Sequence, residues 1–244
     1  EKYRKLSELL KETNSELENI NWISTHDLQE PLRKIQLISS RILTKEGDML
    51  SDTVQDAIKR MNSSANRMQT LLVDILKYTR LKHHDDSFEQ VDLDYVIDEV
   101  KADLAESMGE FSAVVRTEDL PTITGMPFLL KQLFSNLIAN SIKYASPERE
   151  PVIIVDAEPT PQRFNDLERL YQVIRVTDNG IGFDQDYAEN IFGIFTRLHS
   201  ASEFKGSGVG LALCKKIMQN HNGHITATST EGVGTTMKLF FPLN

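Results

Sequence analysis

Cysteine is almost absent from this sequence, in which Cys214 is the single thiol among 244 residues. One thiol cannot form an intrachain disulfide, and the lack of a disulfide framework fits a reducing compartment. The surrounding stretch GLALCKKI is apolar and helical in pattern. We therefore expect a buried structural cysteine and not a redox site.

Long apolar runs are also missing. The sequence has no stretch of 18 or more apolar residues and no signal peptide. We therefore expect a cytoplasmic segment that makes no membrane contact. Because a helical pattern is already under way at Glu1, we expect a fragment of a longer protein, which could itself be soluble or membrane-anchored.

Basic residues are scarce in the second part of the chain. Residues 1–88 contain 14 Lys and Arg against 14 Asp and Glu, whereas residues 89–244 contain 13 against 22, which accounts for the net charge of −9. Such a balance would repel nucleic acid or an anionic membrane surface, so neither is expected as the main partner. A phosphate-bearing ligand would need local backbone amides and a cation.

The first 87 residues have the periodicity of two paired helices. Apolar residues alternate in steps of three and four up to Ile42, and again from Val54 to Ile75, with turn signals between them at Gly47 and Asp52. This pattern predicts an antiparallel helical hairpin as the domain 1–87. Two helices enclose little core, so we expect a homodimer in which two hairpins form a four-helix bundle.

From residue 88 the pattern changes to a mixture of strands and helices. Strand-like stretches such as PVIIVDAE, YQVIRVTD and TTMKLFFP occur beside apolar helices such as MPFLLKQLFSNLIANSIKYA, and DYVIDEVKADLAESM is expected to be one helix. The sequence predicts an α+β chain whose second domain, 88–244, is a two-layer α/β sandwich with an at least partly antiparallel sheet. KHHDDS, residues 82–87, is a plausible hinge.

His26 lies in the middle of the first helical pattern. It points about 160° away from Leu28 on a helix and therefore faces solvent. A surface histidine is usually only a solvated residue. Here Asp27 can accept or orient the imidazole proton and leave the other ring nitrogen nucleophilic, and Pro31 would bend the helix one turn later.

Two glycine-bearing stretches could hold a nucleotide. In DNGIGFD, the carboxylate of Asp178 can accept a hydrogen bond from an exocyclic amine, while Gly180 and Gly182 let a flat ring approach the backbone. GSGVGLAL contains three glycines, Gly206, Gly208 and Gly210, at the start of a predicted helix. The first backbone amides of a helix favour phosphate. Either stretch alone is a weak signal.

The helix containing SNLIANSIKY has a polar face. Asn136 and Asn140 are four residues apart, and their side-chain carbonyls could bind Mg²⁺, with Lys143 as a counter-charge for phosphate. The alternative is that both asparagines are satisfied by backbone groups in the core. Two polar residues on one face of so apolar a helix are costly without partners.

Five motifs in this order, HDLQEP, NLIANSIKY, DNGIGFD, IFGIFTRLH and GSGVGLALCKKI, resemble the transmitter core of two-component sensor histidine kinases, and the first motif is most similar to phytochrome-like and PAS-bearing sensors. The resemblance covers nearly the whole chain. It implies a helical hairpin followed by a Bergerat-type ATP-binding sandwich, and an ATP-dependent protein histidine kinase. The phosphoryl group would pass from His26 to an aspartate on a response-regulator receiver domain.

The resemblance also implies a role for each matching residue. His26 would be the phosphoacceptor and Asp27 its general base, Asn140 would bind Mg²⁺, and Asp178 would recognise adenine. The remaining nucleotide-binding residues would be Asn136, Lys143, Tyr144, Gly180, Gly182, Gly206, Gly208, Gly210 and Thr235, with Phe192 and Phe195 in a lid.

Two departures from the family pattern have consequences. Asp27 stands where many relatives have the longer Glu. Glu30 stands where relatives that also dephosphorylate their partner carry Thr or Asn, and its carboxylate would repel an aspartyl phosphate, so we expect weak or absent phosphatase activity. The stimulus, the identity of the receiver, and phosphorylation within or between subunits are not determined by the sequence.

Two other functions remain open on the sequence alone. One is a nucleotide-sensing dimerisation scaffold that transfers no phosphoryl group. The other is a chaperone-type ATPase, which would need a glutamate to activate water where this chain has Asn136.

Overall fold

A computed structural model describes residues 27–79, 87–158, 162–163, 169–198, 203–204 and 206–243. The chain divides into two compact units, residues 1–80 and 81–244. His26 and most of the predicted hinge, residues 82–86, lie outside the described residues. Within the described residues, no helix combines the length and apolar character needed to cross a bilayer.

The first unit contains a helical hairpin. A helix over residues 27–46 runs through Pro31 to the short 3-10 turn η1 (Gly47–Met49), and α2 (Asp52–Thr79) follows. The amide of Gln36 donates to Asn66 Oδ1 and to Gln69 Oε1, each at 2.7 Å, while Asn62 donates to Ser40 at 3.4 Å. Later positions on one helix face earlier positions on the other, so the two helices are antiparallel, as predicted.

The heptad pattern of the hairpin divides into two sets of residues seven apart. In α2, Ala65 is buried and Ile58 and Leu72 are half-buried, whereas Val54, Met61 and Met68 are exposed. The first helix divides in the same way, with Leu32 and Ser39 buried and Leu28 and Ile35 exposed. One set closes the hairpin, and the other forms an apolar stripe that the described residues leave uncovered.

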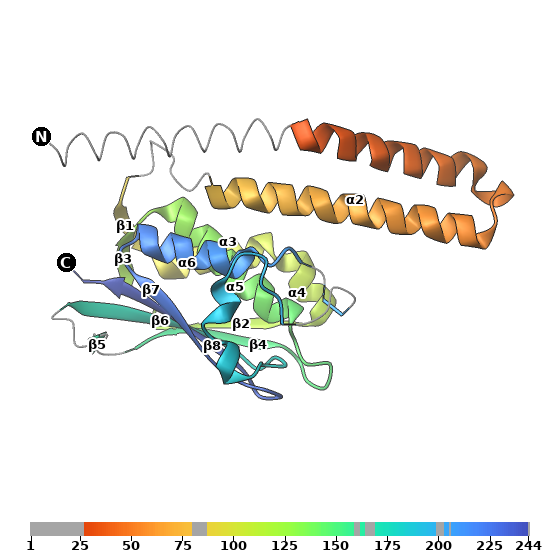
Figure 1. Ribbon diagram of the computed structural model, residues 1–244. Helices are drawn as coiled ribbons and strands as arrows, with labels where there is room; N and C mark the ends of the chain where they lie inside the picture. Colours follow the sequence, from red (N-terminus) through yellow and green to blue (C-terminus); the bar gives the residue numbers. More distant parts are fainter. Residues whose placement is uncertain are drawn as a thin grey trace, which may run out of the picture. The chain divides into compact units, whose positions relative to one another are not determined.

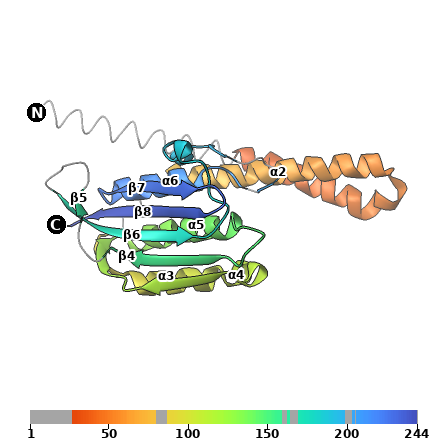
Figure 2. The same ribbon diagram turned by 90° about the horizontal axis from the view of Figure 1, so that it is seen from below.

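The second unit is a two-layer sandwich. Its helices are α3 (Leu93–Asp103), α4 (Ala105–Phe111), α5 (Pro127–Lys143) and α6 (Gly210–Asn220). Its strands are β1 (Glu89–Asp92), β2 (Val114–Glu118), β3 (Thr122–Gly125), β4 (Val152–Ala157), β5 (Gln162–Arg163), β6 (Leu170–Asp178), β7 (His224–Thr230) and β8 (Gly234–Pro242). Figures 1 and 2 show α3, α5 and α6 on one face of the main sheet.

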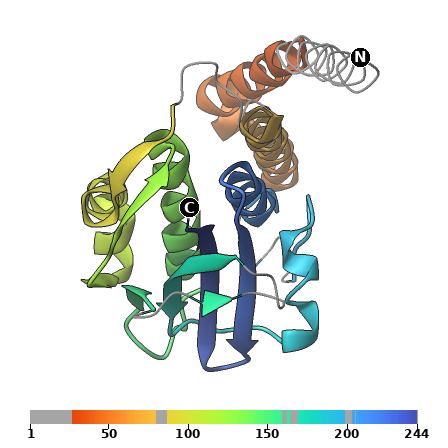
Figure 3. The same ribbon diagram turned by 90° about the vertical axis from the view of Figure 1, so that its left-hand side faces the viewer.

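The main sheet has the order β2-β4-β6-β8-β7, with β5 beside β6. The pair β2–β4 is parallel, and the other pairs are antiparallel. A separate two-stranded sheet joins β1 to β3. The prediction of a partly antiparallel sheet under a helical layer is therefore confirmed, and the end-on view in Figure 3 separates the two layers.

The region predicted as one helix from residue 94 to 108 forms two. Leu104 leaves helical geometry, with φ −99° and ψ 8°, and separates α3 from α4. The helix α3 buries an apolar face that includes Val96 and Val100, whereas α4 has no buried residue. Packing against the core therefore stabilises the first helix only up to Asp103, the end of α3.

The core lies between the helical layer and the sheet. In α5 the apolar residues on the sheet side, among them Leu133, Phe134 and Ile138, are almost completely buried. Pro127 occupies the first turn of this helix, where its missing N–H has no intrahelical partner to lose. Burial of this face fixes the rotation of α5 and with it the direction of its polar residues.

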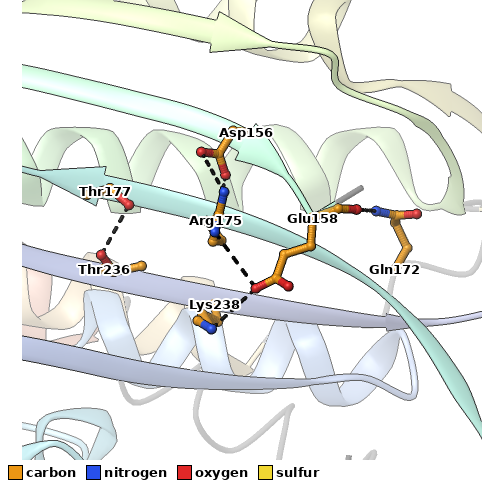
Figure 4. A network of polar contacts seen from close by, with 7 residues as sticks. All are labelled: Asp156, Glu158, Gln172, Arg175, Thr177, Thr236 and Lys238. Carbon is orange, nitrogen blue, oxygen red and sulfur yellow. Dashed lines mark hydrogen bonds and ion pairs between the residues drawn. The ribbon is translucent and has the colours of Figure 1, made fainter. Parts of the chain in front are cut away.

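Charged residues on the central strands form a network across the sheet, shown in Figure 4. Arg175 on β6 donates from Nε and Nη2 to Asp156 on β4 at 2.6 and 3.0 Å, and Lys238 on β8 donates to Glu158 at 3.3 Å. Asp156, Arg175 and Lys238 are also direct neighbours in the strand register. A slip of one residue would turn these charges into the core, so they favour the register that places Asp178 opposite Thr235.

Candidate functional site

A pocket of about 100 Å³, partly open to solvent, lies beside α5 in the second unit. Its walls come from α5, α6, the end of β6, the start of β8 and the segment that follows β6. Five of the predicted site residues line it: Asn140, Tyr144, Asp178, Gly182 and Thr235. Apolar residues such as Leu137, Ile191 and Met237 complete the lining, which is the usual composition of a site for a flat organic ring.

Asp178 forms the polar floor of this pocket. Its Oδ1 accepts the backbone N–H of Gly180 at 2.9 Å and that of Thr235 at 3.2 Å, while Oδ2 accepts the hydroxyl of Ser141 at 3.0 Å. Burial raises the pKa of this carboxyl, and these hydrogen bonds together with the charge of Arg149 lower it. A fixed, desolvated carboxylate of this kind can accept a hydrogen bond from an amino group on a ring.

The glycines of the pocket permit a close approach between loops. Gly182 has φ +63°, and a Cβ there would collide with the carbonyl oxygen of Thr230. Gly234 has φ +144°, and a Cβ there would collide with the carbonyl oxygen of Asp178. Only glycine combines these angles with this spacing, so both loops depend on it.

The polar face of α5 meets the glycine-rich turn before α6. A Cβ on Gly206 would lie 2.6 Å from Lys143 Nζ, and one on Gly210 would lie 3.5 Å from Asn136 Oδ1 and 3.9 Å from Asn140 Nδ2. Two motifs about 70 residues apart in the sequence are thus neighbours in space. An amide oxygen, an ammonium group and the start of a helix together suit a phosphate chain with a cation.

The side chain of Asn136 is only partly satisfied by the backbone. Asn136 Nδ2 donates to the carbonyl of Gln132 at 2.9 Å, one turn earlier, which leaves its Oδ1 directed at the start of α6. For Asn136, the alternative of a core asparagine satisfied by the helix backbone therefore holds for its Nδ2 group and not for its Oδ1.

Lys143 is the last residue of α5, and Tyr144 is its C-cap. Lys143 Nζ donates to the Tyr144 hydroxyl at 2.8 Å and lies 4.3 Å from the centre of its ring. The Tyr144 ring also packs against Phe204 at a centroid distance of 4.9 Å, and its carbonyl accepts the N–H of Ile181 at 2.9 Å. The residue therefore links α5 to the loop that follows Asp178.

The two predicted lid phenylalanines differ in environment. Phe192, in the short turn η3 (Asn190–Phe192), is buried, whereas Phe195 is 53% exposed and has φ +64°. The N–H of Phe195 donates to the carbonyl of Gly208 at 2.9 Å. This segment is therefore joined directly to the glycine-rich turn.

Three residues of the site were missed in the sequence. Ser141 and Ser229 are buried: Ser141 binds Asp178, while the Ser229 hydroxyl pairs with Thr235 and accepts the N–H of Phe183. Arg149 donates to backbone carbonyls on two loops. Ser141 could have been noticed as a polar residue beside Asn140 in an apolar helix, but nothing local marks Ser229 or Arg149.

The predicted phosphoacceptor region is only partly described. His26 lies outside the described residues, and Asp27 is exposed at the start of the described helix. Glu30 forms an ion pair with Lys34, one turn later, at 2.6 Å, and both side chains are more than half exposed.

Comparison with known proteins agrees with this geometry. Residues 125–244 match the family model "Histidine kinase-, DNA gyrase B-, and HSP90-like ATPase". Over 243 residues the chain is 33% identical to the phytochrome-like protein Cph1 of Synechocystis, covering all of this chain and 31% of that protein. It is 29% identical to the sensor-like histidine kinase SenX3 of Mycolicibacterium smegmatis, covering 89% of this chain and 55% of that protein.

A structural relative supports the fold. The crystal structure of full-length ShkA in complex with AMPPNP superposes with a TM-score of 0.63 at 19% identity, covering 92% of this chain and 46% of that one. The chain spans about a third of the length of Cph1 and about half that of SenX3.

Proposed function

Because the chain belongs to the sensor histidine kinases, as their transmitter core, we propose that it phosphorylates His26 with ATP and passes the phosphoryl group to an aspartate of a receiver domain. The observation that carries this proposal is the meeting of the α5 polar face with the glycine-rich turn, beside a pocket whose floor is Asp178. That arrangement offers separate places for a base and for a charged phosphate chain.

The base of ATP would occupy the pocket. Asp178 would accept the exocyclic amine of adenine, and Tyr144 would lie along the ring, with Thr235, Gly180 and Gly182 shaping the cavity. The lining of mainly apolar residues excludes water from this hydrogen bond and strengthens it.

The phosphates would lie between α5 and the start of α6. The backbone amides of Gly206, Gly208 and Gly210 and the ammonium group of Lys143 would neutralise part of their charge. The side-chain oxygens of Asn136 and Asn140 fit a Mg²⁺ ion, because amide oxygen is a ligand that this ion accepts. When bound, Mg²⁺ supplies further neutralisation of charge on the triphosphate. Phe192 and Phe195 would belong to the lid over this site.

In the transfer, a ring nitrogen of His26 attacks the γ-phosphorus in line, and the bond to the bridging oxygen of ADP breaks. Asp27 holds the proton on the other ring nitrogen and so keeps the attacking nitrogen unprotonated. The phosphohistidine then transfers its group to the receiver's aspartate. Positioning and charge neutralisation supply most of the catalysis in such a reaction.

A homodimer of hairpins fits the uncovered apolar stripe. Val54, Met61 and Met68 are 43%, 56% and 46% exposed, and Ile35 on the other helix is 38% exposed. Large apolar residues repeated every seven positions on two paired helices are best buried by a second hairpin, which gives a four-helix bundle.

Glu30 supports a kinase with little phosphatase activity. Its carboxylate is more than half exposed beside Lys34, on the helix whose described part starts at Asp27. A negative charge there disfavours a receiver that carries an aspartyl phosphate. Rapid removal of phosphate from a phosphorylated receiver by the purified chain would contradict this part of the proposal.

The test of the main proposal is incubation with γ-labelled ATP and Mg²⁺. The expected result is acid-labile, alkali-stable label on the protein that is absent from His26→Ala. Label that persists in His26→Ala would refute the assigned phosphoacceptor. Release of phosphate without labelled protein would favour a chaperone-type ATPase, and nucleotide binding with neither outcome would favour a scaffold.

A further inference from the structure

Arg149 joins two loops that are distant in the sequence. It lies in the segment between α5 and β4, and its Nε donates to the carbonyl of Asn179 at 2.6 Å. Its Nη2 lies 2.8 Å from the carbonyl oxygen of Gly180, 2.7 Å from that of Gly232 and 3.1 Å from that of Val233. One guanidinium therefore holds the loop after β6 and the turn between β7 and β8.

These are the same two loops that hold the Asp178 carboxylate. The N–H of Gly180 comes from the first loop and the N–H of Thr235 from the strand that leaves the second, and both donate to Asp178 Oδ1. Arg149 thus binds carbonyls of the two segments whose amides fix the carboxylate. A shift of either loop would move an amide away from Asp178.

Close packing makes this arrangement sensitive to displacement. The two loops are already so near one another that a Cβ on Gly234 would collide with the carbonyl oxygen of Asp178. Asn179 also anchors the first loop to the start of β4, through Val152 N–H to Oδ1 at 2.9 Å and Nδ2 to the Glu150 carbonyl at 2.9 Å. Arg149 binds carbonyl oxygens of both loops at once.

The chemistry requires arginine and not merely a positive charge. A guanidinium is planar and presents several N–H groups in fixed directions, so it can bind carbonyls on two loops together. A lysine has a single nitrogen on a flexible chain, and it could reach one loop or the other but would not define their spacing.

We propose that Arg149 is a positioning residue that holds Asp178 in place for adenine and thereby sets the affinity and base selectivity for the nucleotide. This inference rests on the proposed function, since it assumes that the pocket binds ATP. Arg149 acts at the base end, whereas the phosphates would lie against Lys143 and the glycine-rich turn. Its loss should therefore raise KM for ATP and leave kcat for autophosphorylation close to the wild-type value.

The experiment compares Arg149→Lys, Arg149→Met and wild type, using the whole chain. Calorimetry gives Kd for ADP and for GDP, and autophosphorylation gives KM and kcat for ATP. Arg116→Met is the matched control, because Arg116 is an exposed arginine on strand β2 of the same unit. Thermal unfolding of each variant reports on the fold.

Both Arg149 variants are expected to raise Kd for ADP and KM for ATP roughly ten- to hundredfold, because a small displacement of a positioned group costs this much. The preference for ADP over GDP, measured as the ratio of the two Kd values, should decrease in both Arg149 variants. Arg116→Met should behave as wild type. An Arg149→Lys variant with wild-type constants would overturn the proposal, since charge alone would then suffice. Lower melting temperatures with an unchanged Kd in both variants would also overturn it.

Failure of the proposed function gives a different result. Without kinase activity, wild type would take up no label from γ-labelled ATP, and without a nucleotide site it would bind no ADP, whatever residue stands at position 149. If wild type binds ADP and the Arg149 variants bind it equally well, only the proposed role of Arg149 is refuted.

Discussion

His221 Nε2 accepts the backbone N–H of Met126 at 3.0 Å, across 95 residues of sequence. Its Nδ1 faces the carbonyl of Ile217 at 2.8 Å, so the ring is the neutral tautomer with the proton on Nδ1. Phe88 packs edge-on against the same ring at 5.3 Å. A buried imidazole thus joins the end of α6 to the start of α5, the two helices whose polar ends form the proposed phosphate site.

This contact predicts a pH dependence of stability. Burial lowers the pKa of His221 below its ordinary value of 6.5, partly offset by the Ile217 carbonyl. The unfolded chain therefore binds a proton more readily than the folded one, and the stabilisation is complete above pH 6.5 and is lost as the pH falls from there towards the folded-state pKa. His221→Phe should lower the free energy of unfolding by about 1–3 kcal/mol at pH 8, the cost of leaving Met126 N–H unpaired.

Thermal unfolding of wild type and His221→Phe between pH 8 and pH 5 checks this prediction. The difference in free energy of unfolding between the two proteins should become smaller as the pH falls. A gap that stays constant over the whole range would show that protonation of His221 does not matter to stability.

Asp178→Asn should weaken nucleotide binding without unfolding the protein. The asparagine retains an oxygen for the N–H groups of Gly180 and Thr235 but loses the negative charge. A hydrogen bond to a charged group contributes about 1.5–3 kcal/mol, so ADP should bind about 10- to 150-fold more weakly.

The same carboxyl should give nucleotide binding a pH dependence. Because burial raises the pKa of Asp178 above 3.8, wild-type affinity should fall as the pH drops through this raised value, earlier than for an ordinary aspartate. Titration calorimetry at several pH values should show this decline in wild type, and an equal decline in Asp178→Asn would assign it to another group.

Two glycines with similar backbone angles should respond differently to alanine. Gly182 and Gly232 have φ of +63° and +76°, but a Cβ on Gly182 would meet the Thr230 carbonyl, whereas one on Gly232 would meet nothing within 4 Å. Gly232→Ala should cost about 1–2 kcal/mol for the left-handed conformation. Gly182→Ala should cost at least about 2 kcal/mol more, because a backbone atom must also move. Equal melting temperatures for the two variants would contradict the close approach at Gly182.

A charge on the exposed stripe of the hairpin should separate the proposed dimer. Met61→Glu places a carboxylate on the stripe, whereas Ser63→Glu places one about 200° away around α2 and serves as the control. Analytical ultracentrifugation should find monomers of Met61→Glu and dimers of wild type and Ser63→Glu. Dimers of Met61→Glu with unchanged affinity would place the interface elsewhere.

The sequence by itself determined most of the elements and the chemistry available to them. Heptad spacing located the hairpin, and the strand-like stretch YQVIRVTD forms nearly all of β6. Each of these features depends on residues within a few positions of one another, so local periodicity and turn residues record them. The polar residues of α5 and the glycines before α6 were recognisable for the same reason.

Only the tertiary structure decided which distant segments meet. The neighbouring strands β2 and β3 join different sheets, with β2 beside β4 and β3 beside β1. Arg149 reaches carbonyls 30 to 84 residues away, and Ser229 reaches Phe183 across 46. Such contacts form because burying the core of α5 against the sheet fixes the loops at its edge, and no local pattern specifies which carbonyls then come within reach.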